Sequence, residues 1–380
     1  MKVRMFRCMV GALLLVVIVA TGCTVVVQPD AGAVVPAETE STGHVSPTDS
    51  VEAQIANAMS AAPLAIAQDA TILGFPVEGE EMVLLREGTN GWTCLADWPA
   101  SPTNDPMCND GVWKAWMDAF LAGEEPEVTR PGLSYMLQGG DDTSNVDPFA
   151  PVPEDMEEWV TTPPHLMLLL PGKFDAEDFT TDYESGYPYI MWDETPYEHL
   201  MIPVVPAETE STGHVSPTDS VEAQIANAMS AAPLAIAQDA TILGFPVEGE
   251  EMVLLREGTN GWTCLADWPA SPTNDPMCND GVWKAWMDAF LAGEEPEVTR
   301  PGLSYMLQGG DDTSNVDPFA PVPEDMEEWV TTPPHLMLLL PGKFDAEDFT
   351  TDYESGYPYI MWDETPYEHL MIPVVPADRQ

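Results

Sequence analysis

The sequence VVPAETESTGHVSPTDSVEAQIANAM occupies residues 34–59 and occurs again, unchanged, at residues 204–229. The identity continues from there, so that Val34 to Pro203 is repeated residue for residue as Val204 to Pro373. Solenoid proteins repeat units of roughly 20 to 50 residues, whereas a unit of this length can bury a core of its own. The sequence therefore predicts two identical domains, each folding independently of its twin.

Residues 1–22 are typical of a signal peptide. Three basic residues precede an apolar run over residues 9–20, which is too short to span a bilayer comfortably. The run ends in Ala20-Thr21-Gly22-Cys23, which is similar to the lipidation motif of bacterial lipoproteins. We therefore expect an exported protein, anchored through a lipid on Cys23 to a membrane that faces the periplasm or the cell exterior. Secretion of the cleaved chain is the alternative.

The remaining boundaries follow from composition. Stretches rich in Val, Pro, Ser, Thr and Glu, without helical or strand periodicity, predict flexible segments before each domain. The predicted order after the signal peptide is a lipidated N-terminus and tether (23–49), a first domain (50–203), a linker (204–219), a second domain (220–373) and a tail (374–380).

The charge of the chain restricts its partners. Asp and Glu number 64 against 12 Lys and Arg, which gives a formal net charge of −52. Such a chain repels phosphate backbones and anionic membrane surfaces, so nucleic acid is excluded and membrane attachment would depend on the lipid. Cations or a cell-surface ligand remain as partners, and the sequence does not indicate an oligomeric state.

Each repeat contains one cysteine pair, Cys94 with Cys108 and Cys264 with Cys278. In an exported protein we expect a disulfide within each repeat, where closing a loop of this size contributes about 3 kcal/mol. A zinc site is the alternative, although the spacing matches no common zinc motif and no CxxC motif occurs.

The pattern within a repeat predicts an α+β fold, with an antiparallel sheet and about two helices packed on it. Helices are expected at Ser50–Ser60, with Asp49 or Ser50 as N-cap, and at Asp110–Leu121, which would bury residues 112, 113, 116, 117, 120 and 121. Three strands joined by turns predict an antiparallel meander over Thr71–Phe75, Glu81–Arg86 and Trp92–Ala96. Further strands are expected at Leu133–Leu137, His165–Leu170, Tyr189–Trp192 and His199–Ile202.

Three segments resemble a family of uncharacterised exported bacterial proteins: REGTNGWTC at 86–94, YMLQGG at 135–140 and TPYEHLM at 195–201. The similarity covers roughly residues 52–203 of each copy. It implies a shared fold and export, and it implies no activity. Members of that family have a single such domain, so the duplication is a departure.

Two His-x-Met segments suggest a metal site. His165 and Met167, and likewise His199 and Met201, begin predicted strands in which residues i and i+2 point to one face. If the two strands are neighbours, two imidazoles and two thioethers would converge, and this donor set suits copper. The alternative is that the methionines fill the core and the histidines are structural.

A second candidate metal site is the loop over residues 139–147. Oxygen-bearing side chains alternate along it in the manner of a calcium loop, at Asp141, Thr143, Asn145 and Asp147, with Asp142 beside them. Val146 and Val152 replace the glycine and glutamate of an EF-hand, so only a looser calcium site is expected. An acidic turn with its own Asx hydrogen bonds is the alternative.

A hydrolase is the enzymatic alternative. It would use His165 or His199 as general base, one of the carboxylates Asp193, Glu194 and Glu198, and Ser134, Thr161 or Thr162 as nucleophile. No nucleophile elbow, HExxH motif, phosphate loop or dinucleotide fingerprint occurs. The sequence therefore favours a non-catalytic binding or structural module, with calcium as the first ion to consider and copper as the second.

Overall fold

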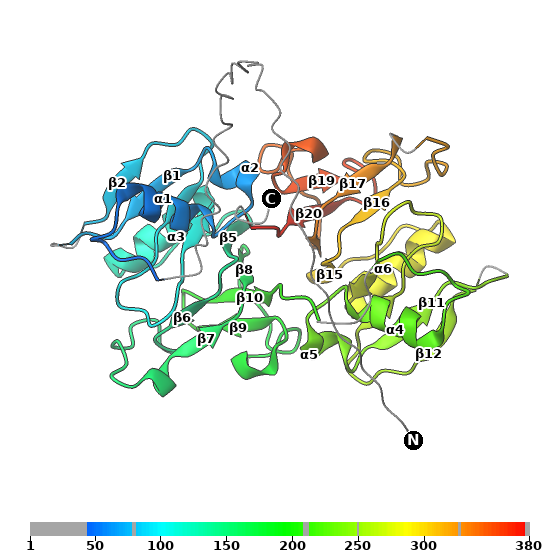
Figure 1. The fold of residues 1–380 in the computed structure, drawn as a ribbon, viewed down its shortest axis with the longest axis horizontal. Coiled ribbons are helices and arrows are strands. Elements are labelled where there is room, and N and C mark those ends of the chain that lie inside the picture. The colour runs from blue at the N-terminus through cyan, green and yellow to red at the C-terminus, as the bar shows by residue number, and fades with distance from the viewer. Residues whose placement is uncertain (1–43, 78–80, 208–212, 249–250, 326–327, 377–380) are drawn as a thin grey trace, which may run out of the picture. The chain divides into compact units, whose positions relative to one another are not determined.

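The computed structural model describes residues 44–77, 81–207, 213–248, 251–325 and 328–376 (Figure 1). The predicted signal peptide, Cys23 and the tether up to residue 43 lie outside these residues. Within them, the two repeats have the same element order and the same strand pairings. The structure therefore confirms an α+β fold that is present twice.

The first repeat contains three α-helices and ten strands among its described residues. The helices are α1 (Val51–Met59), α2 (Leu64–Ala67) and α3 (Gly111–Ala122). The strands are β1 (Thr71–Gly74), β2 (Val83–Arg86), β3 (Thr93–Leu95), β4 (Met107–Asn109), β5 (Gly132–Met136), β6 (Gly140–Asp142), β7 (Val160–Thr162), β8 (His165–Leu169), β9 (Tyr189–Met191) and β10 (His199–Pro203). Short 3-10 helices occupy Met156–Glu158 (η1) and Tyr183–Ser185 (η2).

The second repeat has the corresponding elements. Its helices are α4 (Val221–Met229), α5 (Leu234–Ala237) and α6 (Gly281–Ala292), and η4 covers Tyr353–Ser355. Its strands are β11 (Thr241–Gly244), β12 (Val253–Arg256), β13 (Thr263–Leu265), β14 (Met277–Asn279), β15 (Gly302–Met306), β16 (Gly310–Asp312), β17 (Val330–Thr332), β18 (His335–Leu339), β19 (Tyr359–Met361) and β20 (His369–Pro373).

The predicted meander is wrong. The eight-stranded sheet has the order β2-β1-β3-β4-β5-β8-β10-β9, in which β3 pairs with β1 in parallel and every other pair is antiparallel. Strand β2 lies at the edge of the sheet, and its Val83 and Leu84 side chains are exposed there. Strand β3 lies between β1 and β4, and its Cys94 is fully buried. Strands β6 and β7, which the sequence did not predict, form a separate two-stranded ribbon.

A glycine allows the chain to cross from one side of β1 to the other. The Gly88 N–H lies 3.2 Å from Thr71 Oγ1 and the Thr89 N–H lies 2.8 Å from the Asp69 carbonyl, so the chain passes directly over the start of β1. A Cβ atom on Gly88 would lie 2.1 Å from the Thr71 nitrogen, which no side chain can tolerate. Gly88 is therefore required for the parallel pair.

The two long helices begin and end within one residue of the predicted bounds. The Ser50 side chain accepts a hydrogen bond from Ala53 N at α1, and that of Asp110 accepts one from Trp113 N at α3. Helix α3 ends at Gly123, which adopts the left-handed conformation (φ 68°). One prediction for α3 is wrong: Leu121 is 64% exposed. Helix α2 was not predicted.

The predicted disulfides are confirmed. Cys94 is bonded to Cys108 and Cys264 to Cys278, each across neighbouring strands of one repeat. Because β3 and β4 are only three residues long, the covalent link holds together a part of the sheet that has few backbone hydrogen bonds.

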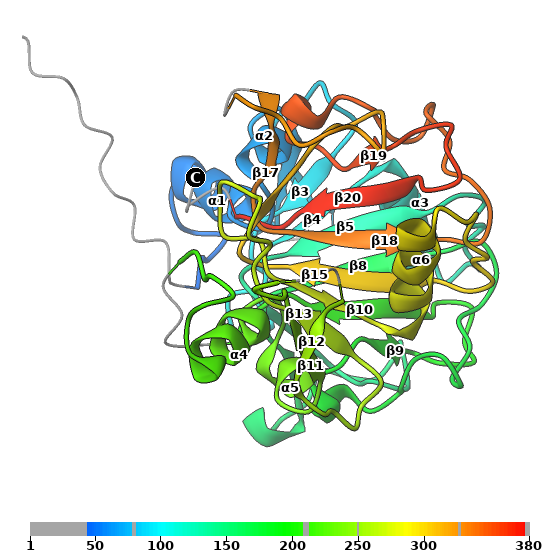
Figure 2. The same ribbon diagram turned by 90° about the vertical axis from the view of Figure 1, so that its right-hand side faces the viewer.

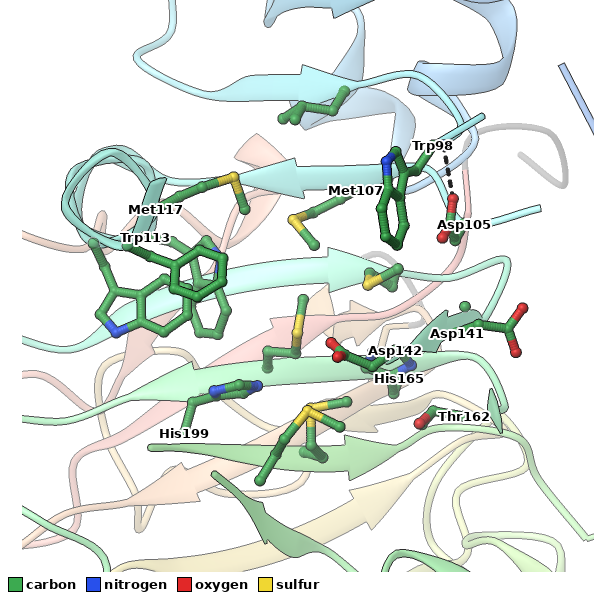
Figure 3. Close-up of a pocket in the computed structure, with 18 of the residues that line it drawn as sticks. Trp98, Asp105, Met107, Trp113, Met117, Asp141, Asp142, Thr162, His165 and His199 are labelled. Atoms are coloured by element: carbon green, nitrogen blue, oxygen red, sulfur yellow. Dashed lines mark hydrogen bonds between the residues drawn. The ribbon is translucent and has the colours of Figure 1, made fainter. Parts of the chain in front are cut away.

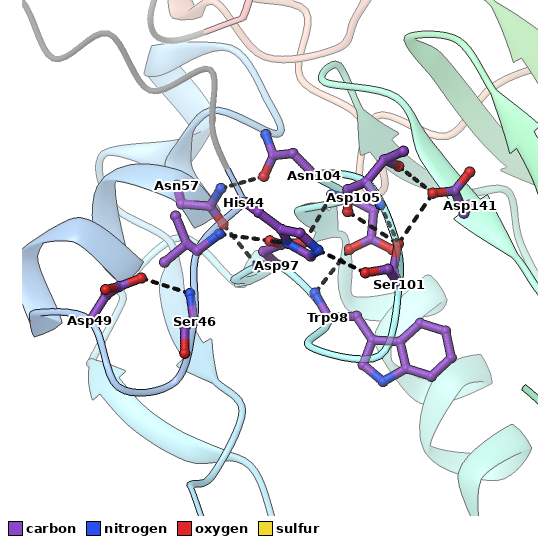
Figure 4. Close-up of polar contacts among 12 residues, drawn as sticks. His44, Ser46, Asp49, Asn57, Asp97, Trp98, Ser101, Asn104, Asp105 and Asp141 are labelled. Carbon is purple, nitrogen blue, oxygen red and sulfur yellow. Dashed lines mark hydrogen bonds and ion pairs between the residues drawn. The ribbon is translucent and has the colours of Figure 1, made fainter. Parts of the chain in front are cut away.

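Ordered contacts begin earlier than the predicted domain boundary at residue 50. The His44 side chain is bonded to the Asp97 carboxylate, and its twin His214, from the predicted linker, is bonded to Asp267 (Figure 4). The start of the linker is also packed, because Val204 is buried and its N–H donates to the Pro164 carbonyl at 2.8 Å.

The sheet of each repeat has two buried faces. One face, which includes Leu133, Tyr135 and Leu168, belongs to a cluster of buried side chains that is continuous across both repeats. Figure 2 views this region with the sheet of the second repeat in front. The other face packs against α3 or α6 and forms a separate cluster in each repeat. The expectation that each repeat folds around a core entirely its own is therefore wrong.

Candidate functional site

Each repeat contains a cavity on the face of the sheet that carries the long helix, α3 or α6 (Figure 3). The volumes are about 310 Å³ in the first repeat and about 410 Å³ in the second. Every lining residue of a cavity comes from its own repeat. Cavities of this size hold small molecules, and they are generally lined by apolar side chains with a few placed polar groups.

The floor of the cavity is formed by methionines. Five adjacent strands each contribute one, in the order Met107 (β4), Met136 (β5), Met167 (β8), Met201 (β10) and Met191 (β9). Their register places Met167 directly opposite Met201. Flexible thioether side chains adapt to ligands of different shape, so this floor suits a small apolar molecule.

One end of the cavity is aromatic. Helix α3 presents Trp113 and Trp116, and the chain after β9 presents Trp192. The three indoles surround His199 with ring centroids 5.3, 5.5 and 5.1 Å from the imidazole, each in an edge-on arrangement. The buried Nε1 of Trp113 has no hydrogen-bond partner among the described residues, and neither does that of its twin Trp283.

The opposite end is polar. Asp105, Asp142, Thr162 and His165 line it. Figure 3 shows the carboxylate of Asp142 directed toward the methionines and that of Asp141 directed away from them. Burial raises the pKa of Asp142 to about 6, against the two backbone hydrogen bonds from Thr143 and Ser144 that lower it. Asp142 is therefore the carboxylate best placed to meet a ligand.

The two cavity histidines are neutral. His165 Nδ1 donates to the Pro163 carbonyl at 2.8 Å and His199 Nδ1 donates to the Tyr197 carbonyl at 3.0 Å. Complete burial lowers the pKa of each imidazole to about 4. The Nε2 atom of His165 is consequently a buried acceptor, and it has no partner among the described residues.

The strands that carry the histidines are neighbours, as the copper hypothesis requires, but the two imidazoles do not converge. His165 pairs with Pro203, four residues along β10 from His199, which corresponds to about 13 Å at the usual rise per residue. Figure 3 accordingly shows His199 at the aromatic end and His165 at the polar end. The geometry gives no support to one copper ion bound by both histidines.

The oxygen atoms of the predicted calcium loop do not point toward one common position. Asp141 accepts hydrogen bonds from the hydroxyl groups of Thr103 and Thr161, Asp142 faces the cavity, and Asp147 accepts from Phe149 N at 3.0 Å. Asn145 donates to the Thr181 carbonyl. Across the described ranges, no group of three or more His, Cys, Asp or Glu side chains is placed to hold a metal ion. The observed contacts are those of an acidic turn with Asx hydrogen bonds.

The groups proposed for a hydrolase are also separated. Ser134 Oγ donates to Asn109 Oδ1 at 2.6 Å, and the Thr162 hydroxyl is bonded to Tyr189. Glu198 accepts from Phe174 N at 2.8 Å and lies 3.3 Å from Lys173 Nζ. In the part of the chain that the structure describes, no hydrogen bond joins either cavity histidine to a hydroxyl or carboxylate proposed for catalysis.

A polar network supports the acidic end of the cavity (Figure 4). Both ring nitrogens of His44 donate, one to Asp97 and one to the Ser101 carbonyl, and this pairing raises the pKa of the imidazole. Asp97 accepts from Asp105 N at 3.1 Å, and Asp105 accepts from Trp98 N at 2.9 Å. Burial, followed by the hydrogen bond with Asp97, raises the pKa of Asp105 to about 8, so it is protonated at neutral pH.

Most of the cavity was not predicted from the sequence. The His-x-Met segments identified two of its strands, but the methionines at positions 82, 107, 117 and 136 and the tryptophans at 98, 113 and 116 were not linked to a site. One signal was available, because the chain contains 21 Met. Methionine at that frequency is typical of adaptable binding surfaces.

Comparisons with protein-family models, with curated proteins and with solved structures found no match for this chain. Within the described residues, no helix is both long and apolar enough to cross a membrane.

Proposed function

We propose that the protein is an exported, lipid-anchored binding protein, and that each repeat binds one small, largely apolar molecule carrying a protonated nitrogen. Binding takes place in the methionine-floored cavity and involves no catalysis. The lipid anchor at Cys23 is supported by the sequence pattern that precedes it.

The observation that carries this proposal is the distribution of unpaired polar atoms around an apolar cavity. The His165 Nε2 acceptor and the Trp113 Nε1 donor are buried without partners at opposite ends, and the second repeat repeats this at His335 and Trp283. Leaving such atoms unpaired costs about 1–3 kcal/mol each, which a bound molecule would recover if it displaced the side chains that cover them and supplied matching groups. The Asp142 carboxylate adds a preference for positive charge at the His165 end.

Two probes with the same ring system test the proposal. Naphthalene measures the apolar contribution and naphthylmethylammonium adds the charged nitrogen, with binding followed through the fluorescence of the cavity tryptophans. We expect both to bind and the cation to bind more tightly. Because the pKa of Asp142 is about 6, affinity for the cation should rise from about pH 5 to about pH 7, whereas affinity for naphthalene should not change.

Substitution of the carboxylate locates the site. Asp142→Asn combined with Asp312→Asn should weaken binding of the cation by about tenfold to about a hundredfold and leave naphthalene unaffected, because a hydrogen bond to a charged group contributes about 1.5–3 kcal/mol. Asp147→Asn combined with Asp317→Asn is the matched control, since Asp147 lies in the same loop but outside the cavity lining. Failure of both probes to bind would refute the proposal.

Copper(I) is the second candidate ligand, favoured by one observation. Met167 lies directly opposite Met201 on the cavity floor, and soft thioether pairs bind Cu(I). Competition with a chromogenic Cu(I) chelator under reducing conditions measures this. Met167→Leu combined with Met201→Leu should abolish Cu(I) binding by the first repeat and retain that by the second, and equal binding by variant and wild type would exclude this site.

A further inference from the structure

The two repeats contact each other through polar interactions that occur in symmetric pairs. Asn90 Nδ2 donates to the Tyr357 hydroxyl at 3.0 Å, and Asn260 Nδ2 donates to the Tyr187 hydroxyl at the same distance. The ion pairs between the repeats are also symmetric: Arg130 lies 3.1 Å from Asp348, and Arg300 lies 3.2 Å from Asp178. Each of these hydrogen bonds and ion pairs therefore occurs twice, with the roles of the two repeats exchanged.

The backbone also approaches closely in the same symmetric way. A Cβ atom on Gly186, which follows η2, would lie 2.6 Å from the Ala235 Cβ in α5 of the second repeat. The same distance separates a Cβ on Gly356 from the Ala65 Cβ in α2. The loop after η2 of each repeat therefore packs directly on the short helix of the other.

Apolar side chains fill the space between these polar contacts. The inner face of each repeat is the face of its sheet that does not carry α3 or α6. Its buried residues form one continuous cluster with members from both repeats, among them Leu166, Leu200 and Ile202 and their twins. In contrast, the clusters beneath the two cavities contain residues of one repeat each. The inner face is thus the apolar surface on which the two repeats share one buried cluster, together with the helices α1 and α2 and their counterparts α4 and α5.

We infer that this inner face is a self-complementary interface whose partner is a second copy of the same repeat, so that two repeats without a covalent link associate as a symmetric dimer. An interface in which residue i contacts j and j contacts i closes on itself with two-fold symmetry. The contacts satisfy this condition although the two repeats belong to one chain. Because the sequences of the repeats are identical, either can take the place of the other.

The full chain tests this inference after cleavage between its repeats. A protease recognition sequence is inserted between Ala207 and His214, the folded protein is cut, and its size is measured by light scattering during gel filtration. The two halves should remain together at the size of the uncut protein. Separation into species of half that size would overturn the inference.

A substitution at the close backbone contact shows which surface holds the halves. Gly186→Ala combined with Gly356→Ala places a methyl group against the opposite helix on both sides, and we expect association of the cut halves to weaken more than about tenfold. Gly123→Ala combined with Gly293→Ala is the matched control. Those glycines have similar positive φ angles, 68° and 67° against 72°, with nothing within 4 Å of the added atom.

The control separates loss of the interface from loss of the fold. Both pairs of substitutions strain the backbone alike, and both uncut variants should remain folded and keep the near-ultraviolet circular dichroism of the wild type. Only the pair at Gly186 and Gly356 should then dissociate after cutting. Equal dissociation of both variants, or of neither, would show that the halves are held by some other surface.

Discussion

The buried histidines should make the protein sensitive to acid. The pKa of His199 and of its twin His369 is about 4 in the folded protein, against an ordinary value of 6.5. A base whose folded pKa is lowered contributes stability that is complete above pH 6.5 and is lost as the pH falls toward 4, because only the unfolded chain takes up the proton. Between about pH 7 and about pH 5 this loss is about 2 kcal/mol for each histidine.

His199→Asn combined with His369→Asn removes this titration. The asparagine amide reproduces the Nδ1 donor that binds the Tyr197 carbonyl, so the backbone partner is retained. Urea unfolding followed by tryptophan fluorescence at both pH values gives the free energy of unfolding of each protein. The variant will be less stable than the wild type at neutral pH. However, its free energy of unfolding should fall less between the two pH values than that of the wild type, by about 2 kcal/mol for each repeat.

Titration of the carboxylates does not affect the comparison of variant and wild type, because both proteins contain the same carboxylates. An equal pH dependence in variant and wild type would refute the reasoning, since it would mean that the imidazole is not desolvated. His44→Asn serves as a control of opposite sign. The pKa of His44 is raised by Asp97, so its contribution is present below pH 6.5 and is lost as the pH rises through the folded pKa.

Three further predictions concern stability. Replacing Cys94 and Cys108 by alanine should lower the free energy of unfolding of the first repeat by about 3 kcal/mol, and an unchanged urea midpoint would contradict this. The folded pKa of Asp105 is about 8, so the stability that its protonated carboxyl contributes is lost as the pH rises through that value. Asp105→Asn should therefore lose less stability than the wild type between about pH 5 and about pH 9, as measured by thermal melts at the two pH values. The melting temperature should rise with NaCl concentration, because counterions relieve the repulsion within a chain of net charge −52, and a flat dependence would mean that the acidic groups are already paired.

Helix α3 could be predicted because its signals are local. Asp110 supplies the N-cap, Gly123 the left-handed ending, and Trp113 and Trp116 the buried face, all within one stretch of chain. The exposure of Leu121 could not be predicted. It depends on where the opposing surface ends, and the sequence of the helix does not contain that information.

The order of the sheet could not be predicted because its determinants are not local. Strand β4 is only Met107–Asn109, too short to show alternation, and its place is set by the disulfide and by pairing with β5. The parallel pair of β1 and β3 depends on the close passage at Gly88, which is apparent only in three dimensions. The methionine floor follows from that order, so the sequence indicated the two His-x-Met strands and not the cavity.

The sequence did contain one sign of the interface between the repeats. Strand β8 reads His165-Leu-Met-Leu-Leu169, and all five residues are buried. A run without alternation is typical of a strand covered on both faces, whereas helix α3 covers only one. The second covering layer comes from elsewhere, and the cluster of buried residues on that face contains side chains of α1 and α2 together with residues of the other repeat.

The positions of the proposed binding cavity and of the interface between the repeats explain how one domain could be duplicated without loss of either. The cavity lies on the face that carries α3 and uses residues of one repeat only, whereas the interface lies on the opposite face. Joining two repeats in one chain therefore makes their association intramolecular, at an effective concentration set by the short linker, and leaves both cavities complete. On this argument the tandem chain gains stability from the link, and its affinity for a ligand at each cavity is that of a single repeat.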